Sequence, residues 1–277
     1  QVSGSTGLLF SVSDDLTGDL FTVYDSTGAA VMNIDADTVT LNTANLDLDN
    51  TTFTNQKGVI MKDGVPFIHN FNYGNNGTVT TVGNNTFVGE SAGNFTMWAT
   101  ATVTNQSSEN TAVGYAAMSA NTTGNRNTAI GFLALQANTT GPNNVAIGYD
   151  SLNENTTGNG NTAVGFNTLR HNITGINNVA IGRQAAMWIT TSNNVVIGNN
   201  SGLYRGLGTD IFTAGTSNIL IGETARASDN GVTNETVIGY NAVGSGSNTT
   251  TIGNSSQTLC KINGAVQVGQ SSATASA

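Results

Sequence analysis

The residues of this chain that could catalyse a reaction are few and widely separated. The segment Gly89-Glu90-Ser91-Ala92-Gly93 matches the G-x-S-x-G pattern that surrounds a nucleophilic serine. Such a serine needs a histidine as its general base, and the chain has only His69 and His171. The same slot recurs without the serine at Gly114–Ala117 and Gly222–Ala225. We therefore interpret the match as a repeated turn and predict no catalytic residue.

Acidic side chains could instead bind a cation, and they are concentrated near the start of the chain. Eight of the 17 precede residue 50: Asp14, Asp15, Asp19, Asp25, Asp35, Asp37, Asp47 and Asp49. They form neither an Asp-x-Asp-x-Asp-Gly loop nor a Gly-Gly-x-Gly-x-Asp run, the usual patterns for calcium. Turn formation and protection of strand edges explain them better. We predict no metal site in the chain.

Other cofactor chemistry is equally poorly supported. The single cysteine, Cys260, excludes a disulfide within the chain and a cysteine-rich zinc site. No Gly-x4-Gly-Lys phosphate loop is present. A glycan-cleaving enzyme would need two carboxylates facing one groove. The acids between residues 84 and 253 show no repeated pairing: Glu90, Glu109, Asp150, Glu154, Asp210, Glu223, Asp229 and Glu235. We predict a protein that is not an enzyme and has no cofactor.

The feature that positions all of these residues is a repeated phrase, Asn-x-Ala-Val/Ile-Gly. Its five cleanest copies close at glycines spaced 17 residues apart: Gly114, Gly131, Gly148, Gly165 and Gly182. Looser copies close at Gly89, Gly198, Gly222, Gly239 and Gly253, which makes ten in all. A fixed period of this length is typical of a solenoid. We predict one coil per copy over residues 84–253, with parallel strands stacked about 4.8 Å apart into a rod of roughly 50 Å.

Within each coil the alternation of the strand predicts two faces. In Asn144–Gly148, Val145 and Ile147 lie on one face and Ala146 lies on the other. A second apolar row, four residues after the glycine, contains Met118, Leu135, Leu152 and Leu169. We expect the Val/Ile row and the Leu/Met row to form the two walls of the coil. The small alanine face is then expected to pack closely against copies of the same chain, as a parallel homotrimer.

Segments such as Phe132–Ala137 have the composition of a helix, but six residues between turn signals are too few for one. We expect a strand or a tight coil there. Asn-Thr-Thr-Gly runs, as at Asn138–Gly141, supply the turns.

The flanking segments predict three further parts. Residues 1–50 repeat a Thr-Gly turn followed by an alternating strand, as in Thr6–Asp14 and Thr17–Asp25, and form an N-terminal β-repeat segment for attachment. Residues 51–83 form a transition that caps the first coil with aromatic residues. Residues 254–277 form a C-terminal cap and tail.

The 17-residue spacing fails twice, between Gly89 and Gly114 and between Gly198 and Gly222. Insertions in a solenoid map to loops on one face, which is often the binding face. The aromatic and basic residues in or beside these insertions are candidate receptor or glycan contacts: Trp98, Trp188, Tyr204, Arg205 and Phe212. The alternative is that the aromatic rings fill a core widened by the extra residues.

Composition excludes several classes of partner. Only 9% of the residues are charged, the net charge is −9, and the eight Lys and Arg are scattered singly. The chain therefore lacks the basic surface that nucleic acids require. No run of 18 apolar residues exists, so we expect no membrane insertion.

The Asn-x-Ala-Ile-Gly coils resemble the head repeats of trimeric autotransporter adhesins. That resemblance implies a left-handed parallel β-roll with three chains side by side. The leader Leu9-Phe-Ser-Val-Ser-Asp-Asp-Leu-Thr-Gly-Asp-Leu-Phe-Thr-Val23 and the Asn-Thr-Thr-Gly variant of the repeat are similar to tail-fibre proteins of tailed bacteriophages. The long coiled-coil stalk and membrane-anchoring barrel of the adhesins are not seen in this sequence.

Together these resemblances imply a structural tail fibre of a phage virion that mediates attachment to the host surface. Its partners would be other tail or baseplate proteins, through the N-terminal segment, and a host-surface glycan or protein. The alternative is the passenger of a bacterial surface adhesin, and a glycan-cleaving tailspike ranks below both.

Overall fold

The computed structural model describes residues 9–12, 21–24, 30–34, 39–41, 60–62, 65–69, 79–94, 101–204, 206 and 211–257. Within these ranges the chain forms eighteen β-strands and no helix, so the prediction of an all-β protein is confirmed. The chain divides into two units, Gln1–Asp49 and Asn50–Ala277, which are described separately.

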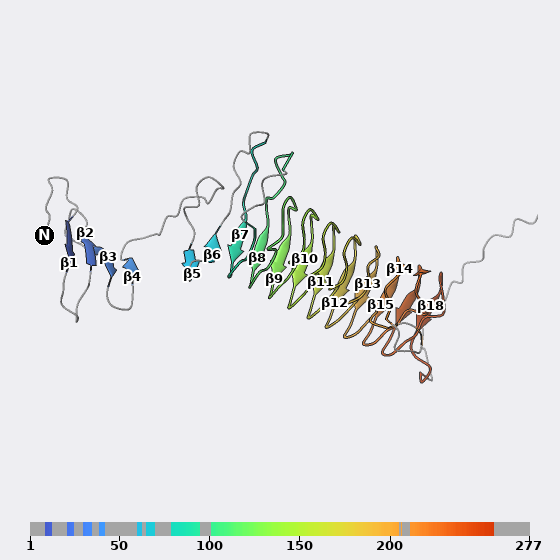
Figure 1. Ribbon diagram of the computed structural model, residues 1–277. Helices are drawn as coiled ribbons and strands as arrows, with labels where there is room; N and C mark the ends of the chain where they lie inside the picture. The colour runs from blue at the N-terminus through green and yellow to red at the C-terminus, as the bar shows by residue number, and fades with distance from the viewer. Residues whose placement is uncertain are drawn as a thin grey trace, which may run out of the picture. The chain divides into compact units, whose positions relative to one another are not determined.

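The first unit is an antiparallel meander (Figure 1). Its strands pair in chain order: β1 (Leu9–Val12), β2 (Phe21–Tyr24), β3 (Ala30–Ile34) and β4 (Val39–Leu41). The first three strands each fall in one copy of the Thr-Gly repeat, and β4 falls in the alternating stretch that follows. The Thr-Gly spacing thus locates the strands, because each turn returns the chain beside its predecessor.

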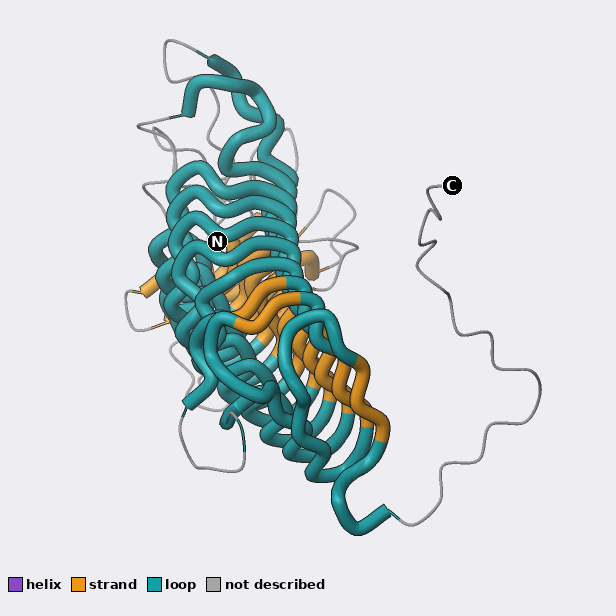
Figure 2. The backbone as a smooth tube through the Cα atoms, turned by 90° about the vertical axis from the view of Figure 1, so that its right-hand side faces the viewer, coloured by secondary structure: helices purple, strands orange, loops and turns teal. Residues whose placement is uncertain are grey.

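The second unit is a parallel β-solenoid, as predicted. Every copy of the repeated phrase forms one strand of a ten-strand parallel ladder (Figure 1). These strands are β7 (Thr86–Val88), β8 (Thr111–Val113), β9 (Thr128–Ile130), β10 (Val145–Ile147), β11 (Thr162–Val164), β12 (Val179–Ile181), β13 (Val195–Ile197), β15 (Ile219–Ile221), β17 (Thr236–Ile238) and β18 (Thr250–Ile252). Figure 2 shows them stacked along one side of the coils, with turns completing each circuit.

The register places equivalent residues of neighbouring copies directly opposite each other. Ala146 pairs with Ala129 below and with Ala163 above. The closing glycine allows this stacking. Gly148 has a φ of 129°, and a Cβ added there would collide with the carbonyl oxygen of Gly165 in the next coil. Glycine is therefore required at this position both for its backbone conformation and for the close approach of the next coil.

The faces of the strands are oriented differently from our expectation. The alanines are fully buried inside their own coil and pack in one core with the Leu/Met row, which is also fully buried. The residue before each glycine points outward instead, and Ile130, Ile147 and Ile181 are 40%, 36% and 41% exposed. The prediction that the alanine face packs against other copies was wrong, because a coil this thin has room for a large side chain from only one wall.

The polar side chains inside the coil form ladders of their own. Eight of the ten copies begin with a buried Asn, whose side-chain oxygen accepts a hydrogen bond from the backbone N–H of the first residue of the next copy. Asn161 accepts from Asn178 at 3.0 Å and donates to the carbonyl of Gly175 at 2.9 Å. A second row lies at the Asn-Thr-Thr-Gly turn, where the side-chain amide N–H of Asn155 donates to the side-chain oxygen of Asn138 at 2.9 Å. Amides satisfied this way stabilise the stack without an apolar core across its full width.

The turn that contains the Leu/Met row is a tight coil. Leu133 and Leu135 have φ values of 55° and 52°, and the equivalent residues of neighbouring coils repeat this pattern. Alternating left-handed residues prevent a helix, as the short length of Phe132–Ala137 predicted. In the longer segment between Gly198 and Gly222 lies β14 (Gly215–Thr216), which pairs with β16 (Val232–Thr233) as a small additional parallel sheet.

At its first coil the ladder changes from parallel to antiparallel pairing. β6 (Val65–His69) pairs antiparallel with β7 on one side and with β5 (Ile60–Lys62) on the other. This hairpin covers the strand edge that the first coil would otherwise expose. The remainder of the predicted aromatic cap, including Phe71 and Tyr73, lies outside the described residues.

Candidate functional site

The broadest candidate for recognition is the outward face of the ten-strand ladder. Two residues of every strand point away from the core. One row is Thr, Val or Ile, as at Thr128 and Val145, and the next is the Val/Ile row that ends each strand. No charged residue lies within any of the ten strands. A continuous uncharged face of this kind, with a Val or Ile in every strand, is a candidate interaction surface.

A ladder of aromatic rings borders this face, one residue after the closing glycine. Tyr115, Phe132, Tyr149 and Phe166 stack in sequence with centroids 5.1–5.2 Å apart and interplanar angles of 7–15°. Each ring is 41–47% exposed. The guanidinium of Arg183 lies 5.9 Å from the centroid of Phe166 and ends the ladder. The period of 17 residues is the reason that the rings coincide, and a search for isolated motifs does not reveal them.

The proposed contact residues are not gathered at one site. Trp188 is half-buried and stacks on His171, with centroids 3.8 Å apart and planes 10° apart. Tyr204 is half-buried, bridges to Ile211 at the base of the second insertion, and has the Arg226 guanidinium 5.9 Å from its centroid. Phe212 is fully buried in the core, so its ring does not reach the surface of the chain.

Phe212 therefore fits the alternative that inserted residues widen the core, because its ring fills space that a 17-residue coil does not have. Trp98 and Arg205 lie outside the described residues. Of the five candidates, Trp188 and Tyr204 are those that the structure places partly at the surface.

The G-x-S-x-G segment is an ordinary repeat turn. It follows β7, and no helix follows it within residues 79–94. The Nε2 atom of His69 lies 2.9 Å from the carbonyl oxygen of Ala92, and its ring packs 4.9 Å from that of Phe87. Burial lowers the pKa of His69 to about 4, against the smaller opposing effect of the Ala92 hydrogen bond. A buried histidine oriented in this way, with its ring nitrogen against the Ala92 carbonyl, caps the core.

Several titratable groups of the described solenoid meet around Asp150. Asp150 is 5% exposed, and its Oδ2 lies 3.4 Å from the Nε of Arg170. Burial raises the pKa of Asp150, Arg170 opposes this effect, and the nearby Glu154 adds to it. Glu154 in turn lies 2.9 Å from the Nδ1 of His171. Sequence reasoning treated these acids as scattered, because their proximity arises only when successive coils stack.

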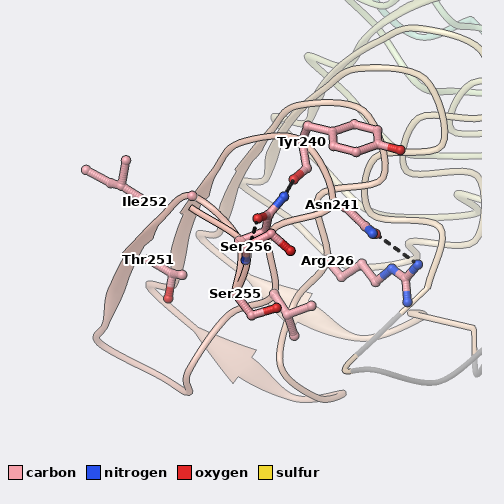
Figure 3. Close-up of a pocket in the computed structure, with 10 residues that line it drawn as sticks. Arg226, Tyr240, Asn241, Thr251, Ile252, Ser255 and Ser256 are labelled. Atoms are coloured by element: carbon pink, nitrogen blue, oxygen red, sulfur yellow. Dashed lines mark hydrogen bonds between the residues drawn. The ribbon is translucent and has the colours of Figure 1, made fainter. Parts of the chain in front are cut away.

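A hollow of about 760 Å³ lies beside the last described coils (Figure 3). Tyr240 and Asn241 line one side, Ser255 and Ser256 line another, and Arg226 reaches in and donates a hydrogen bond to Asn241 at 3.2 Å.

The described residues contain no group of three or more His, Cys, Asp or Glu side chains arranged to hold a metal ion. They also contain no helix long and apolar enough to cross a membrane. Comparisons of the chain with protein-family models, with curated proteins and with solved structures found no match.

Proposed function

We propose that this protein is a non-enzymatic structural fibre of a phage virion that mediates attachment to the host surface. The observation that carries the proposal is the uncovered apolar face along the whole ten-strand ladder. A coil with only a few core side chains and one uncovered wall suits a rigid rod that is completed by other copies.

In the proposed assembly three left-handed β-rolls lie side by side in parallel, with their Val/Ile rows toward one another. The face fits another copy of the chain because it has a Val or Ile in every coil, contains no charged residue, and repeats at the strand spacing. Identical rods can then contact each other coil by coil. The N-terminal meander would join this fibre to other tail or baseplate proteins.

The proposed attachment is multivalent. Three copies of each exposed residue on one rod, and several fibres on one particle, increase avidity without a deep pocket. Trp188 and Tyr204, here called the contact pair, are the described members of the proposed contact surface for a host glycan or protein.

Substitution of Ile147 by Asp tests the assembly. A carboxylate in the middle of the apolar face would be buried against its symmetry mates, so we expect the mass measured by light scattering to fall from three chains to one. The β-signal in circular dichroism should remain, because Ile147 points out of its own coil. Thr140→Asp, in an exposed turn away from the strands, is the matched control and should leave the mass unchanged.

A monomer mass for the unsubstituted protein would contradict the proposed trimer.

Antibody labelling distinguishes the two biological settings. Label on virions supports the tail fibre, whereas label on bacterial cells and never on virions supports the alternative, a surface adhesin passenger. Release of reducing sugar from host polysaccharide by the purified protein would overturn the non-enzymatic assignment in favour of a tailspike.

A further inference from the structure

A column of side chains runs along four successive coils of the solenoid and ends at the second insertion. Glu154, His171 and Trp188 occupy the same position in three successive coils, six residues after the closing glycine. Tyr204 has this position in the next coil, at the base of the insertion. The column therefore presents a carboxylate, an imidazole, an indole and a phenol in order, and its upper half is the contact pair.

His171 lies between two partners, the Glu154 carboxylate and the Trp188 indole. On one side its Nδ1 atom is 2.9 Å from the Oε2 of Glu154. On the other its ring lies flat on Trp188, 3.8 Å away and inclined by 10°. A protonated imidazole gains an ion pair from the carboxylate and a cation–π contact from the indole, whereas a neutral ring retains only a hydrogen bond and stacking.

The other charged groups near this ring are Asp150 and Arg170, which pair with each other at 3.4 Å. Because their charges are opposite, Glu154 supplies the unbalanced negative charge beside His171. The His171 side chain is 16% exposed and the Glu154 side chain is 41% exposed, so the imidazole is largely enclosed while the carboxylate remains in contact with solvent. The Nε2 atom has no hydrogen-bond partner among the described residues, so the ring is held by Glu154 and Trp188.

From this geometry we propose that the Glu154–His171–Trp188 column is a proton-dependent clamp on Trp188. When His171 is protonated, the ring is held between the carboxylate and the indole, and Trp188 is fixed against the coil. When His171 is neutral, the stack loosens and the indole becomes more accessible. Histidine is the side chain whose charge ordinarily changes between pH 5 and 8. The clamp would regulate the contact pair, and this consequence rests on the proposed attachment function.

Tryptophan fluorescence tests the clamp directly. The chain has two tryptophans, so Trp98→Phe leaves Trp188 as the only indole. In this background we expect acrylamide to quench Trp188 about two- to fivefold more strongly at pH 8 than at pH 5, the ratio that loss of a cation–π contact implies. His171→Gln in the same background should abolish the pH dependence. Glu154→Gln should make the difference in quenching between the two pH values smaller, because the ion pair on one side of the His171 ring is removed.

Quenching of the Trp98→Phe protein that is constant from pH 5 to 8 overturns the proposal, as does an unchanged transition after His171→Gln. Circular dichroism at both pH values, with Glu109→Gln as a variant of an exposed acid, shows whether a transition reflects unfolding. An unfolding transition at the same pH in all variants would also overturn it.

Binding to host cells separates this proposal from the attachment function. Binding that changes between pH 5 and 8, and ceases to change after His171→Gln, supports regulation of the contact pair. Binding that is identical at both pH values overturns the regulation. Absence of binding at every pH contradicts the attachment function, while the fluorescence transition still decides whether the clamp exists.

Discussion

Leucine occupies left-handed backbone positions in this protein, a conformation that favours glycine and asparagine. Leu135 has a φ of 52°, but it is fully buried and contributes to the core, so its burial offsets the cost. Leu133 has a φ of 55° and is only half-buried. The equivalent residue two coils later is Asn167, with a φ of 53°.

We expect Leu133→Asn to stabilise the protein by about 0.5–1 kcal/mol, because Asn tolerates the left-handed region that Leu resists. Chemical denaturation measures the change. Leu135→Asn is the matched control with the same backbone strain, and it should destabilise by about 2–5 kcal/mol because it removes a buried side chain. A loss of stability for Leu133→Asn would show that packing outweighs strain at this position.

Asp150 should give the protein a measurable pH dependence. Its pKa is raised in the folded state, chiefly by burial. The stability that this group contributes is therefore present below its unfolded pKa and is lost as pH rises through its folded value. The Asp150→Asn variant does not undergo that loss. The free energy of unfolding of the variant minus that of the unsubstituted protein should therefore be larger at pH 7 than at pH 3. Equal differences at the two pH values would contradict the raised pKa.

At the scale of the elements, the stability of the β6–β7 junction should decrease as the pH falls. Burial lowers the pKa of His69 from 6.5 to about 4, so the folded chain resists protonation that the unfolded chain accepts. This contribution is complete above pH 6.5 and is lost as pH falls toward 4. The difference in pKa corresponds to about 3 kcal/mol at most.

Hydrogen exchange of the β6 amides should therefore accelerate between pH 6.5 and 4.5, after correction for the intrinsic pH dependence of exchange. His69→Gln keeps a donor for the Ala92 carbonyl but does not titrate, so it should remove the acceleration. Protection of β6 that is equal at both pH values in the unsubstituted protein would mean that His69 does not govern this junction.

At the scale of the whole solenoid, each coil contacts chiefly its two neighbours, so the number of coils should be adjustable. Deletion of residues 144–160 removes one full period and joins Asn143 to Asn161, which continues both the strand and the buried Asn ladder. We expect this variant to fold cooperatively, with lower stability and a solenoid about 4.8 Å shorter by small-angle scattering.

Deletion of residues 144–151 removes about half a period and is the control. It brings polar turn residues to core positions, so we expect loss of the β-signal in circular dichroism. A folded half-period deletion would show that register does not control this structure.

The repeat by itself determined the fold class, the number of strands in the ladder and their parallel order. A period of 17 residues that returns Asn, a β-branched residue and Gly to the same place permits little besides stacked coils. The same regularity identified Gly89–Gly93 as a turn and predicted that Phe132–Ala137 would not be a helix. These conclusions depend on the spacing of residue types and on local backbone preferences, both of which can be read from the sequence.

The tertiary structure decided which face of each strand is inside. Alternation separates Ala146 from Ile147 but does not orient them. The row that contains Leu152 determines which strand face is buried, because its large side chains fill the thin coil and leave room only for alanine on the opposite wall. This limit on volume involves residues from two different walls of the coil, which only the folded structure brings together. The Val/Ile row is therefore left on the outside, where it is open to partners. Stacking likewise brought Glu154, His171 and Trp188 together, although they are 17 residues apart in sequence, because one coil of the solenoid returns the chain to the same edge.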